Sequence, residues 1–255
     1  MSLRTRSLTR EFGGLTAVDA VDFELGGDEL CSLIGPNGAG KTTFFNLLTG
    51  TLEPTAGTIE FRRDGSWHDL TEAPVHRTAR MGIHRSYQLT NVFPNSTVRE
   101  NVRIAAQAHG SDSMRLWRNV GGFDAYLEEA EDVLERVGLA GKAELPATSL
   151  SHGERRMLEI AIALAGDPDV LLLDEPNAGV SSDGIEEIIA LIEDVAEDHA
   201  VLLVEHNMDV VMSVSDRIVV LHQGSVIADG TPAEVRDDEA VQEAYLGGYE
   251  REASA

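Results

Sequence analysis

The sequence has little lysine and a single cysteine, and both shortages are informative. Two of the 20 basic residues, Lys41 and Lys142, are lysine, which leaves 18 arginines. With Cys31 alone no disulfide can form within the chain, which suits a reducing compartment. Cys31 lies in the apolar stretch at residues 30–34, so we predict a buried structural thiol.

Long apolar runs are also missing. The N-terminal stretch MSLRTRSLTREFGG lacks the apolar segment of a secretory signal peptide. No apolar run approaches the roughly 18 residues that a membrane-spanning helix needs. We therefore expect neither a signal peptide nor a transmembrane helix, and we expect a soluble protein of the cytoplasm.

Positive charge is scarce as well. The chain has 44 acidic residues against 20 basic ones, so its formal net charge at pH 7 is −24. This excess argues against a nucleic-acid partner, because neutralising phosphates requires clustered lysine and arginine. The acidic residues repel one another at low ionic strength and are screened at high salt. Our hypothesis is a salt-rich cytoplasm, as in a halophile; the alternative is an acidic protein from an ordinary cell.

The chain alternates between two periodicities, which indicates an α/β fold with a helical insertion. Period-two patterns near the N-terminus predict two β-strands around Gly13–Gly14. Between about residues 98 and 138 the helical period dominates, with helices expected at 98–108 and 123–137 and a loop at 109–122. Further strands are expected at 30–34, 58–62, 83–87, 170–173, 201–204, 217–221 and 226–228, and further helices at 41–49, 184–198 and 208–214.

The segment GPNGAGKT at residues 35–42 matches the pattern of a phosphate-binding loop. Glycines let backbone N–H groups turn towards phosphate oxygens, and the helix that follows directs its positive end at the same anion. Lys41 would place its charge on the β- and γ-phosphates, and the Thr42 hydroxyl would bind Mg²⁺. A glycine-rich connection without a ligand is the alternative. The predicted nucleotide-binding residues here are Gly35, Pro36, Asn37, Gly38, Ala39, Gly40, Lys41, Thr42 and Thr43.

Two apolar strands end in polar residues, in VLLLDEP at 170–176 and VLLVEHN at 201–207. Ligands bind at the carboxyl ends of strands in α/β sheets. Asp174 would hold Mg²⁺ through water, and Glu175 is placed to orient or deprotonate an attacking water. Taken alone, these endings are also compatible with ordinary structural roles, and so is Gln88 after its strand-like run.

The segment LSHGERR at residues 150–156 predicts the start of a helix. Ser151 can be the N-cap, and Glu154 can be its reciprocal partner in a capping box. The apolar run at 157–165 predicts a buried helix behind this cap. By itself the segment gives no reason to expect a ligand, although any helix N-terminus suits an anion.

The order of these motifs resembles the nucleotide-binding domain of the ABC (ATP-binding cassette) ATPases, from Leu3 to about Gly248. The resemblance implies an α/β fold: a RecA-like P-loop NTPase core with an N-terminal antiparallel β subdomain and an inserted α-helical subdomain. The core would comprise residues 1–88 and 157–255, and the helical subdomain residues 89–156. The implied ligands are ATP and Mg²⁺. The implied partners are membrane permease subunits and a second ATPase subunit, arranged head to tail with two ATP molecules between the cassettes.

The same resemblance implies roles for individual residues. Ser151 and Gly153 would contact the γ-phosphate of the ATP that Lys41 of the other subunit holds. Phe12 would stack on adenine, with a core phenylalanine at a strand end as the alternative. Gln88 would sense Mg²⁺ and the attacking water. The implied catalytic residues are Glu175, His206, Gln88 and Lys41, and the implied metal-binding residues are Thr42, Gln88 and Asp174.

Three positions depart from the commonest family pattern. His152 stands where glycine is usual, and Glu154 stands where glutamine is usual. Glu154 would repel a bound phosphate unless its carboxylate turns back to the helix cap. Ser181 stands where the loop after the acidic strand has Asp or Asn, and its shorter side chain would weaken contact across the dimer.

Longer stretches resemble the ATPases of branched-chain amino acid importers, among them FGGLTAV, FPNSTVRENV, DEPNAGVSSD and AYLGG. The resemblance implies ATP hydrolysis that drives import from the inner face of the cell membrane. Cassettes of urea or short-amide importers and of lipopolysaccharide exporters are similar and stay as alternatives. A soluble ABC ATPase of DNA repair or translation is disfavoured by the single cassette and the lack of a Cys pair. A non-hydrolysing regulatory cassette is disfavoured by Glu175 and His206.

The charge excess generates the first testable prediction. If the fold is adapted to high salt, its unfolding midpoint rises between about 0.1 and about 3 M KCl, because the screening length falls to about 3 Å at 1 M. Thermal unfolding followed by circular dichroism measures this midpoint. A midpoint that does not change with salt contradicts the halophilic hypothesis.

Overall fold

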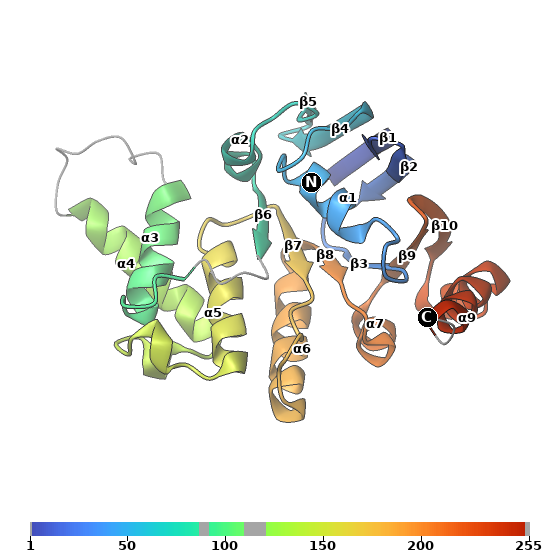
Figure 1. The fold of residues 1–255 in the computed structure, drawn as a ribbon. Coiled ribbons are helices and arrows are strands. Elements are labelled where there is room, and N and C mark those ends of the chain that lie inside the picture. The colour runs from blue at the N-terminus through green and yellow to red at the C-terminus, as the bar shows by residue number, and fades with distance from the viewer. Residues whose placement is uncertain (1, 87–91, 110–120, 253–255) are drawn as a thin grey trace.

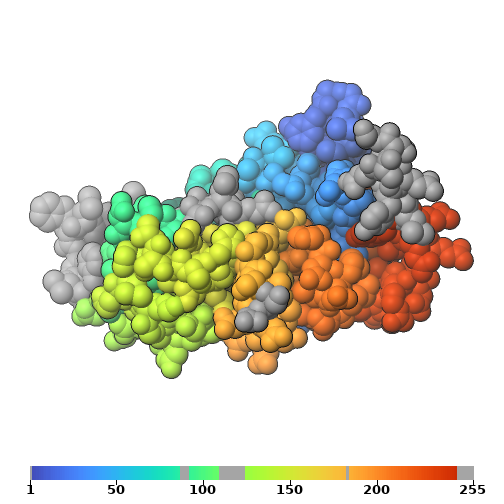
Figure 2. All heavy atoms as spheres, turned by 60° about the horizontal axis from the view of Figure 1, so that its bottom comes forward, coloured from blue at the N-terminus to red at the C-terminus, as the bar shows by residue number. Residues whose placement is uncertain are grey.

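A computed structural model of the chain describes residues 2–86, 92–109 and 121–252. Two β-sheets form its centre, and helices cover them (Figure 1). In that view the helices of the middle region lie at one end of the molecule, and the C-terminal helices lie at the other. The space-filling view in Figure 2 shows the same elongated arrangement from below, with the middle region at one end and the C-terminal region opposite.

The first sheet is antiparallel and confirms the two strands expected near the N-terminus. The hairpin turn carries Gly13 at φ +61°, a left-handed conformation that favours glycine. A second turn falls at Asp64 and Gly65, both of which have positive φ. The strand order is β2-β1-β4-β5, with β1 at Ser2–Phe12, β2 at Leu15–Leu25, β4 at Ala56–Arg63 and β5 at Ser66–Asp69.

The second sheet has six strands and is parallel except at one edge. Each strand expected by its apolar run forms, with ends shifted by no more than a few residues. The last strand, β10, pairs antiparallel with β9, because only a short turn joins them. The order is β10-β9-β3-β8-β7-β6, with β3 at Leu30–Ile34, β6 at Ile83–Ser86, β7 at Val170–Asp174, β8 at Ala200–Val204, β9 at Arg217–His222 and β10 at Ser225–Gly230.

The helices agree with the expected periodicity and add three that the patterns did not predict. The first helix stops as predicted, since Gly50 takes a φ of +71° and its N–H bonds to Leu47 O at 3.0 Å. Of the loop expected at 109–122, residues 109, 121 and 122 are helical, and residues 110–120 lie outside the described ranges. The helices are α1 (Lys41–Leu48), α2 (Val75–Arg80), α3 (Val98–His109), α4 (Gly121–Arg136), α5 (His152–Leu164), α6 (Ser182–Ala196), α7 (Met208–Val214), α8 (Pro232–Arg236) and α9 (Glu239–Glu252). The unpredicted helices are α2, α8 and α9.

Both faces of the central strands are buried, and alternate residues face different cores. In β7, Leu172 belongs to one apolar cluster together with Phe44 of α1. Its neighbours Leu171 and Leu173 belong to another cluster together with Leu158 of α5. Successive strand residues point to opposite faces of a sheet. Helices α1 and α5 therefore cover opposite faces of the six-stranded sheet.

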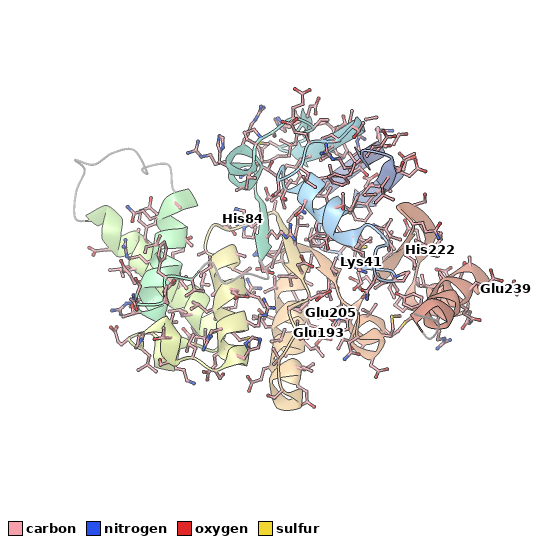
Figure 3. All side chains as sticks on the ribbon, in the orientation of Figure 1. Lys41, His84, Glu193, Glu205, His222 and Glu239 are labelled. Atoms are coloured by element: carbon pink, nitrogen blue, oxygen red, sulfur yellow. The ribbon has the colours of Figure 1, made fainter. Side chains whose placement is uncertain are left out.

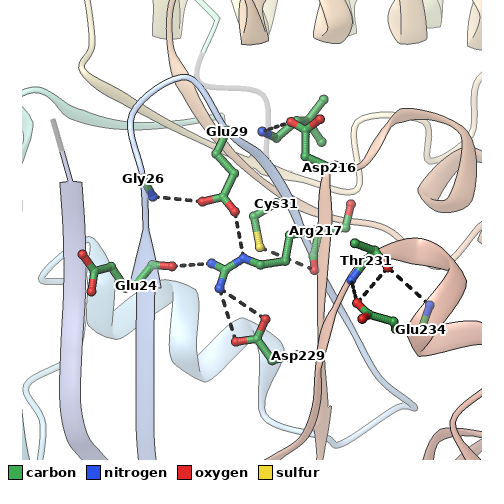
Figure 4. A network of polar contacts seen from close by, with 11 residues as sticks. Glu24, Gly26, Glu29, Cys31, Asp216, Arg217, Asp229, Thr231 and Glu234 are labelled. Atoms are coloured by element: carbon green, nitrogen blue, oxygen red, sulfur yellow. Dashed lines mark hydrogen bonds and ion pairs between the residues drawn. The ribbon is translucent and has the colours of Figure 1, made fainter.

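A polar network surrounds Arg217, the first residue of β9 (Figure 4). Its Nε lies 2.8 Å from Glu29 Oε1, its Nη1 lies 3.2 Å from both carboxylate oxygens of Asp229, and its Nη2 donates to the backbone oxygen of Glu24. The network ties β2 and β10 to β9. Cys31 lies inside it and is fully buried, as expected, and burial raises the pKa of its thiol to about 12.

Within the ranges that the structure describes, no helix is long and apolar enough to cross a membrane.

The Arg217 network predicts a stability difference between two matched substitutions. Arg217→Met leaves Glu29 and Asp229 without their cation and should lower the free energy of unfolding by about 1–3 kcal/mol. Arg236→Met removes an exposed ion pair with Asp237 and should change it by less than about 0.5 kcal/mol. Urea unfolding measures both values. Equal losses in the two variants would show that the network does not stabilise the sheet.

Candidate functional site

The loop between β3 and α1 is held in place by close backbone contacts. Gly35 has a φ of +150° and Gly40 a φ of +107°. A Cβ on Gly35 would lie 2.1 Å from Leu221 O, and one on Gly40 would lie 2.3 Å from Ala17 O, so neither position accepts a side chain. Gly40 is the N-cap of α1 and provides no side-chain cap, so the first N–H groups of α1 are left for an anion.

Lys41 is the first residue of α1 and bends back over this loop (Figure 3). Its Nζ donates to the carbonyl oxygens of Gly35 at 2.6 Å and Pro36 at 3.2 Å. Burial lowers the pKa of this ammonium group, and the charges of Glu175 and Asp174 partly oppose the shift. The charges of Asp174, the last residue of β7, and of Glu175 therefore act on the loop lysine, although more than 130 positions separate them from it in the sequence.

The two acidic residues differ in backbone conformation. Asp174 ends β7 and is 5% exposed. Glu175 has a φ of +47°, which is uncommon for a residue with a Cβ, and its N–H donates to Val204 O at 2.8 Å. Backbone strain of this kind clusters at functional sites. The bond to β8 fixes the turn that sets the direction of the Glu175 side chain.

Arg85 on β6 completes this charged group, and the sequence patterns gave it no role. Its Nη2 lies 2.6 Å from Asp174 Oδ2, and its Nη1 donates to Asn46 Oδ1 at 2.6 Å. An arginine inside a buried strand is the signal that could have identified it, because a buried charge needs a partner.

The end of β8 carries a buried carboxylate and an exposed imidazole. Glu205 is 1% exposed and accepts the N–H groups of Asn177 and His206, both at 3.1 Å. The side chain of His206 is 69% exposed, so its ring is open to a ligand. The amide of Asn177 is buried, and neither its oxygen nor its nitrogen has a hydrogen-bond partner among the described residues. Sequence reasoning missed Asn177, since buried polar groups are recognised only from their surroundings.

The predicted capping box at the start of α5 is confirmed. Ser151 N–H donates to Glu154 Oε2 at 2.8 Å, and Glu154 N–H donates to Ser151 Oγ at 3.3 Å. Glu154 also forms an ion pair with Lys142, which lowers the pKa of its carboxyl group, with the Ser151 N–H as the second cause. The carboxylate thus turns back to the cap and carries a neutralising partner, which removes the repulsion expected for Glu154 towards an anion.

His152, the other unusual residue of this segment, contacts the loop that follows Glu175. Its Nε2 lies 3.2 Å from Ala178 O, so the ring donates to this carbonyl through Nε2–H. A Cβ on Gly179, whose φ is +74°, would lie 2.9 Å from the same nitrogen. A side chain at 179 would displace the His152 ring, and the contact of His152 with Ala178 joins the start of α5 to the loop after β7.

Three further predicted residues, Phe12, Ser151 and Gly153, belong to other elements than the charged group. Phe12 ends β1 and is 42% exposed, which disfavours the core alternative, and Arg10 Cζ lies 4.7 Å from its ring centroid. Ser151 and Gly153 start α5, which covers the sheet face opposite α1. Gln88 lies outside the described residues.

The oxygen donors beside the phosphate loop suit a Mg²⁺ ion that binds together with a nucleotide. The described residues contain no group of three or more His, Cys, Asp or Glu that could hold a metal ion by themselves. Mg²⁺ in nucleotide sites takes only one or two protein oxygens, and phosphates and water supply the rest. The Thr42 hydroxyl and the Asp174 carboxylate are suitable oxygen donors.

Comparison with known proteins gives matches along the whole chain. The family profile described as "ABC transporter" matches residues 18–178, and the one described as "Branched-chain amino acid ATP-binding cassette transporter" matches residues 225–251. The high-affinity branched-chain amino acid transport ATP-binding protein LivG of Salmonella typhimurium is 41% identical, over 96% of this chain and 97% of its own. The corresponding protein BraF of Pseudomonas aeruginosa is 40% identical with the same coverage. The ADP conformation of an ATP-binding cassette of an ABC transporter superposes with a TM-score of 0.82 at 28% identity, over 97% of this chain and 99% of that one.

The contact between His152 and Gly179 predicts an energetic coupling. Gly179→Ala should destabilise the wild-type background through its left-handed φ and through displacement of the His152 ring. In the His152→Gly background only the backbone strain remains, so the loss should be smaller by about 0.5–2 kcal/mol. A double-mutant cycle in urea measures the difference. An equal loss in both backgrounds would mean that the two residues do not interact.

Proposed function

The chain belongs to the ABC transporter family of ATP-binding proteins, and we propose that it is the ATP-hydrolysing subunit of an importer of branched-chain amino acids. The observation that carries the proposal is the convergence of Lys41, Asp174 and Glu175 beside a loop that tolerates no side chain at two of its glycines. The transport assignment follows from relatives that match over nearly their full length and from the profile match at residues 225–251.

ATP would bind with its phosphates in the loop at residues 35–43. Backbone N–H groups at the start of α1 and the Lys41 ammonium group would face the phosphate oxygens. Lys41 is held over the loop by two carbonyl oxygens, and it can exchange these contacts for phosphate with little movement of its backbone. Phe12 would stack on the adenine, which its exposure permits.

Thr42 directly and Asp174 through water would hold Mg²⁺ together with the phosphates, and Gln88 would contribute to the same site. The metal supplies positive charge that neutralises the phosphate oxygens during transfer.

Hydrolysis would depend on the residues that follow β7 and β8. The carboxylate of Glu175 orients a water molecule for attack on the γ-phosphate and takes its proton at a side-chain oxygen. His206 donates a hydrogen bond to the γ-phosphate from its exposed ring. The buried carboxylate of Glu205 fixes the backbone of both loops, through Asn177 and His206.

A second ATPase subunit would complete each site. Ser151 and Gly153 begin the helix that covers the sheet face opposite α1, so within one chain they are not arranged around Lys41. A partner in head-to-tail orientation would bring its own Ser151 and Gly153 to the γ-phosphate. We further propose residues 1–88 with 157–255 as the core and 89–156 as the helical subdomain. The subdomain and the segment around Gln88 would bind membrane permease subunits at the cytoplasmic face of the membrane.

The acidic surface would keep the protein functional in a salt-rich cytoplasm. On α4, the like charge of Asp167 adds to burial in raising the pKa of Glu129, so carboxylates lie close enough to repel one another. Salt screens such repulsion. The same acidity supports the absence of a nucleic-acid partner.

Glu175→Gln tests the catalytic assignment. The variant keeps the size of the side chain but cannot accept the proton, so we expect ATP turnover at least ~100-fold slower, the usual scale for a lost general base. We also expect it to bind MgATP and to accumulate as a dimer in size-exclusion chromatography. Glu193→Gln, an exposed position on α6, is the matched control and should turn over at the wild-type rate. Unchanged turnover in Glu175→Gln would refute the role of Glu175.

A further inference from the structure

The guanidinium group of Arg85 already binds one oxygen of the carboxylate that the proposed function assigns to Mg²⁺. Nη2 of Arg85 lies 2.6 Å from Asp174 Oδ2, and the two side chains are 7% and 5% exposed. Charge-assisted bonds of this length, shielded from water, are much stronger than surface ion pairs. Arginine stays protonated under all working conditions. Asp174 therefore has a permanent cationic partner inside the protein.

Other contacts hold Arg85 in this position. Its Nη1 donates to Asn46 Oδ1 at 2.6 Å, and its Cζ lies 5.4 Å from the ring centroid of Phe45. Both partners belong to α1, the helix that starts at Lys41. Arg85 itself lies on β6, opposite Leu172 of β7. One guanidinium group thus connects β6, the end of β7 and the helix behind the phosphate loop.

Two cations with the same preference would meet at Asp174 when nucleotide arrives. The water through which Asp174 would hold Mg²⁺ donates to the carboxylate, and Nη2 of Arg85 donates to Oδ2 of the same carboxylate. The Asp174 charge already acts on the Lys41 ammonium group as well. Like charges repel strongly where water is excluded, so a further positive charge weakens the hold of Arg85 on the carboxylate.

We propose that Arg85 is a resident counter-cation of Asp174 that competes with Mg²⁺ for this carboxylate. The proposal rests on the metal role given to Asp174 above. Without metal, Arg85 keeps a buried carboxylate from being left without a charge partner, which would be strongly destabilising. With metal, the charged tie between β6 and the end of β7 weakens. β6 ends at Ser86, two residues before Gln88 in the sequence. Metal binding at Asp174 would therefore loosen the strand that leads to Gln88.

Arg85→Gln tests the competition through binding rather than turnover. The full chain is mixed with a fluorescent, non-hydrolysable ATP analogue, and Mg²⁺ is added until the fluorescence saturates. Removing the competing charge should lower the Mg²⁺ midpoint at least ~5-fold, since one neighbouring charge commonly changes the affinity of a carboxylate for a cation tenfold or more. Glutamine keeps a donor for Asn46 and so limits other changes.

The test includes a matched control variant and a second measurement. Arg63 Nε lies 3.6 Å from Oδ2 of Asp169, which precedes β7. Arg63→Gln therefore removes an Arg–Asp pair at the other end of that strand, and it should leave the Mg²⁺ midpoint unchanged. If Arg85→Gln does not fold, Arg85→Lys keeps the charge but loses the fork, and its midpoint should fall less. In the wild-type protein, amide hydrogen exchange at residues 83–86 should become faster with the analogue and Mg²⁺ than with the analogue and EDTA.

The outcomes separate this proposal from the function on which it rests. An equal or higher Mg²⁺ midpoint in Arg85→Gln overturns the competition, and a higher one means that Arg85 orients Asp174 for the metal. Unchanged exchange at residues 83–86 also overturns it. Asp174→Asn serves as the reference: if it leaves the Mg²⁺ midpoint at the wild-type value, the metal role of Asp174 fails, and with it the proposed function at this residue.

Discussion

The central strands β7 and β8 are buried on both faces and are followed by charged side chains at their carboxyl ends, and this constraint places most of the site. All five residues of β7 are buried, and the charged pair Asp174 and Glu175 comes at its carboxyl end. β8 repeats the arrangement with Glu205 and His206. Because β3, β8 and β7 are parallel neighbours, their carboxyl ends meet at one edge. The phosphate loop follows β3 at the same edge, so apolar strands bring the charged residues together.

The charges at this edge are balanced within the protein. Lys41 lies near both acidic residues of β7, and Arg85 binds Asp174 directly. A buried carboxylate without such partners would be costly. The ion pairs thus allow an acidic chain with few lysines to keep carboxylates at a buried position. A Mg²⁺ ion bound at Asp174, as proposed, would therefore disturb charges that are already paired within the protein.

Rigid contacts connect this edge to the start of α5. The His152 ring bonds to Ala178 O, and Gly179 leaves room for it. The loop after Glu175 is also tied to β8 through the Asn177 N–H and Glu205. In the proposed dimer, the start of α5 serves one ATP and Glu175 serves the other. His152, which departs from the commonest signature, therefore connects the start of α5 to the loop that follows Glu175.

The sequence by itself determined the strands, most of the helices, the phosphate loop and the cap at Ser151, because each depends on local periodicity or on a short pattern. It determined the family as well, because the order of the motifs can be read directly from the sequence. Only the tertiary structure decided the partners of Asp174 and His152. Arg85 and Asp174 are far apart in the sequence, and a strand pattern does not show which neighbour a charged side chain meets. Helices α2, α8 and α9 were also missed, because two of them are very short and packing stabilises such helices more than propensity does.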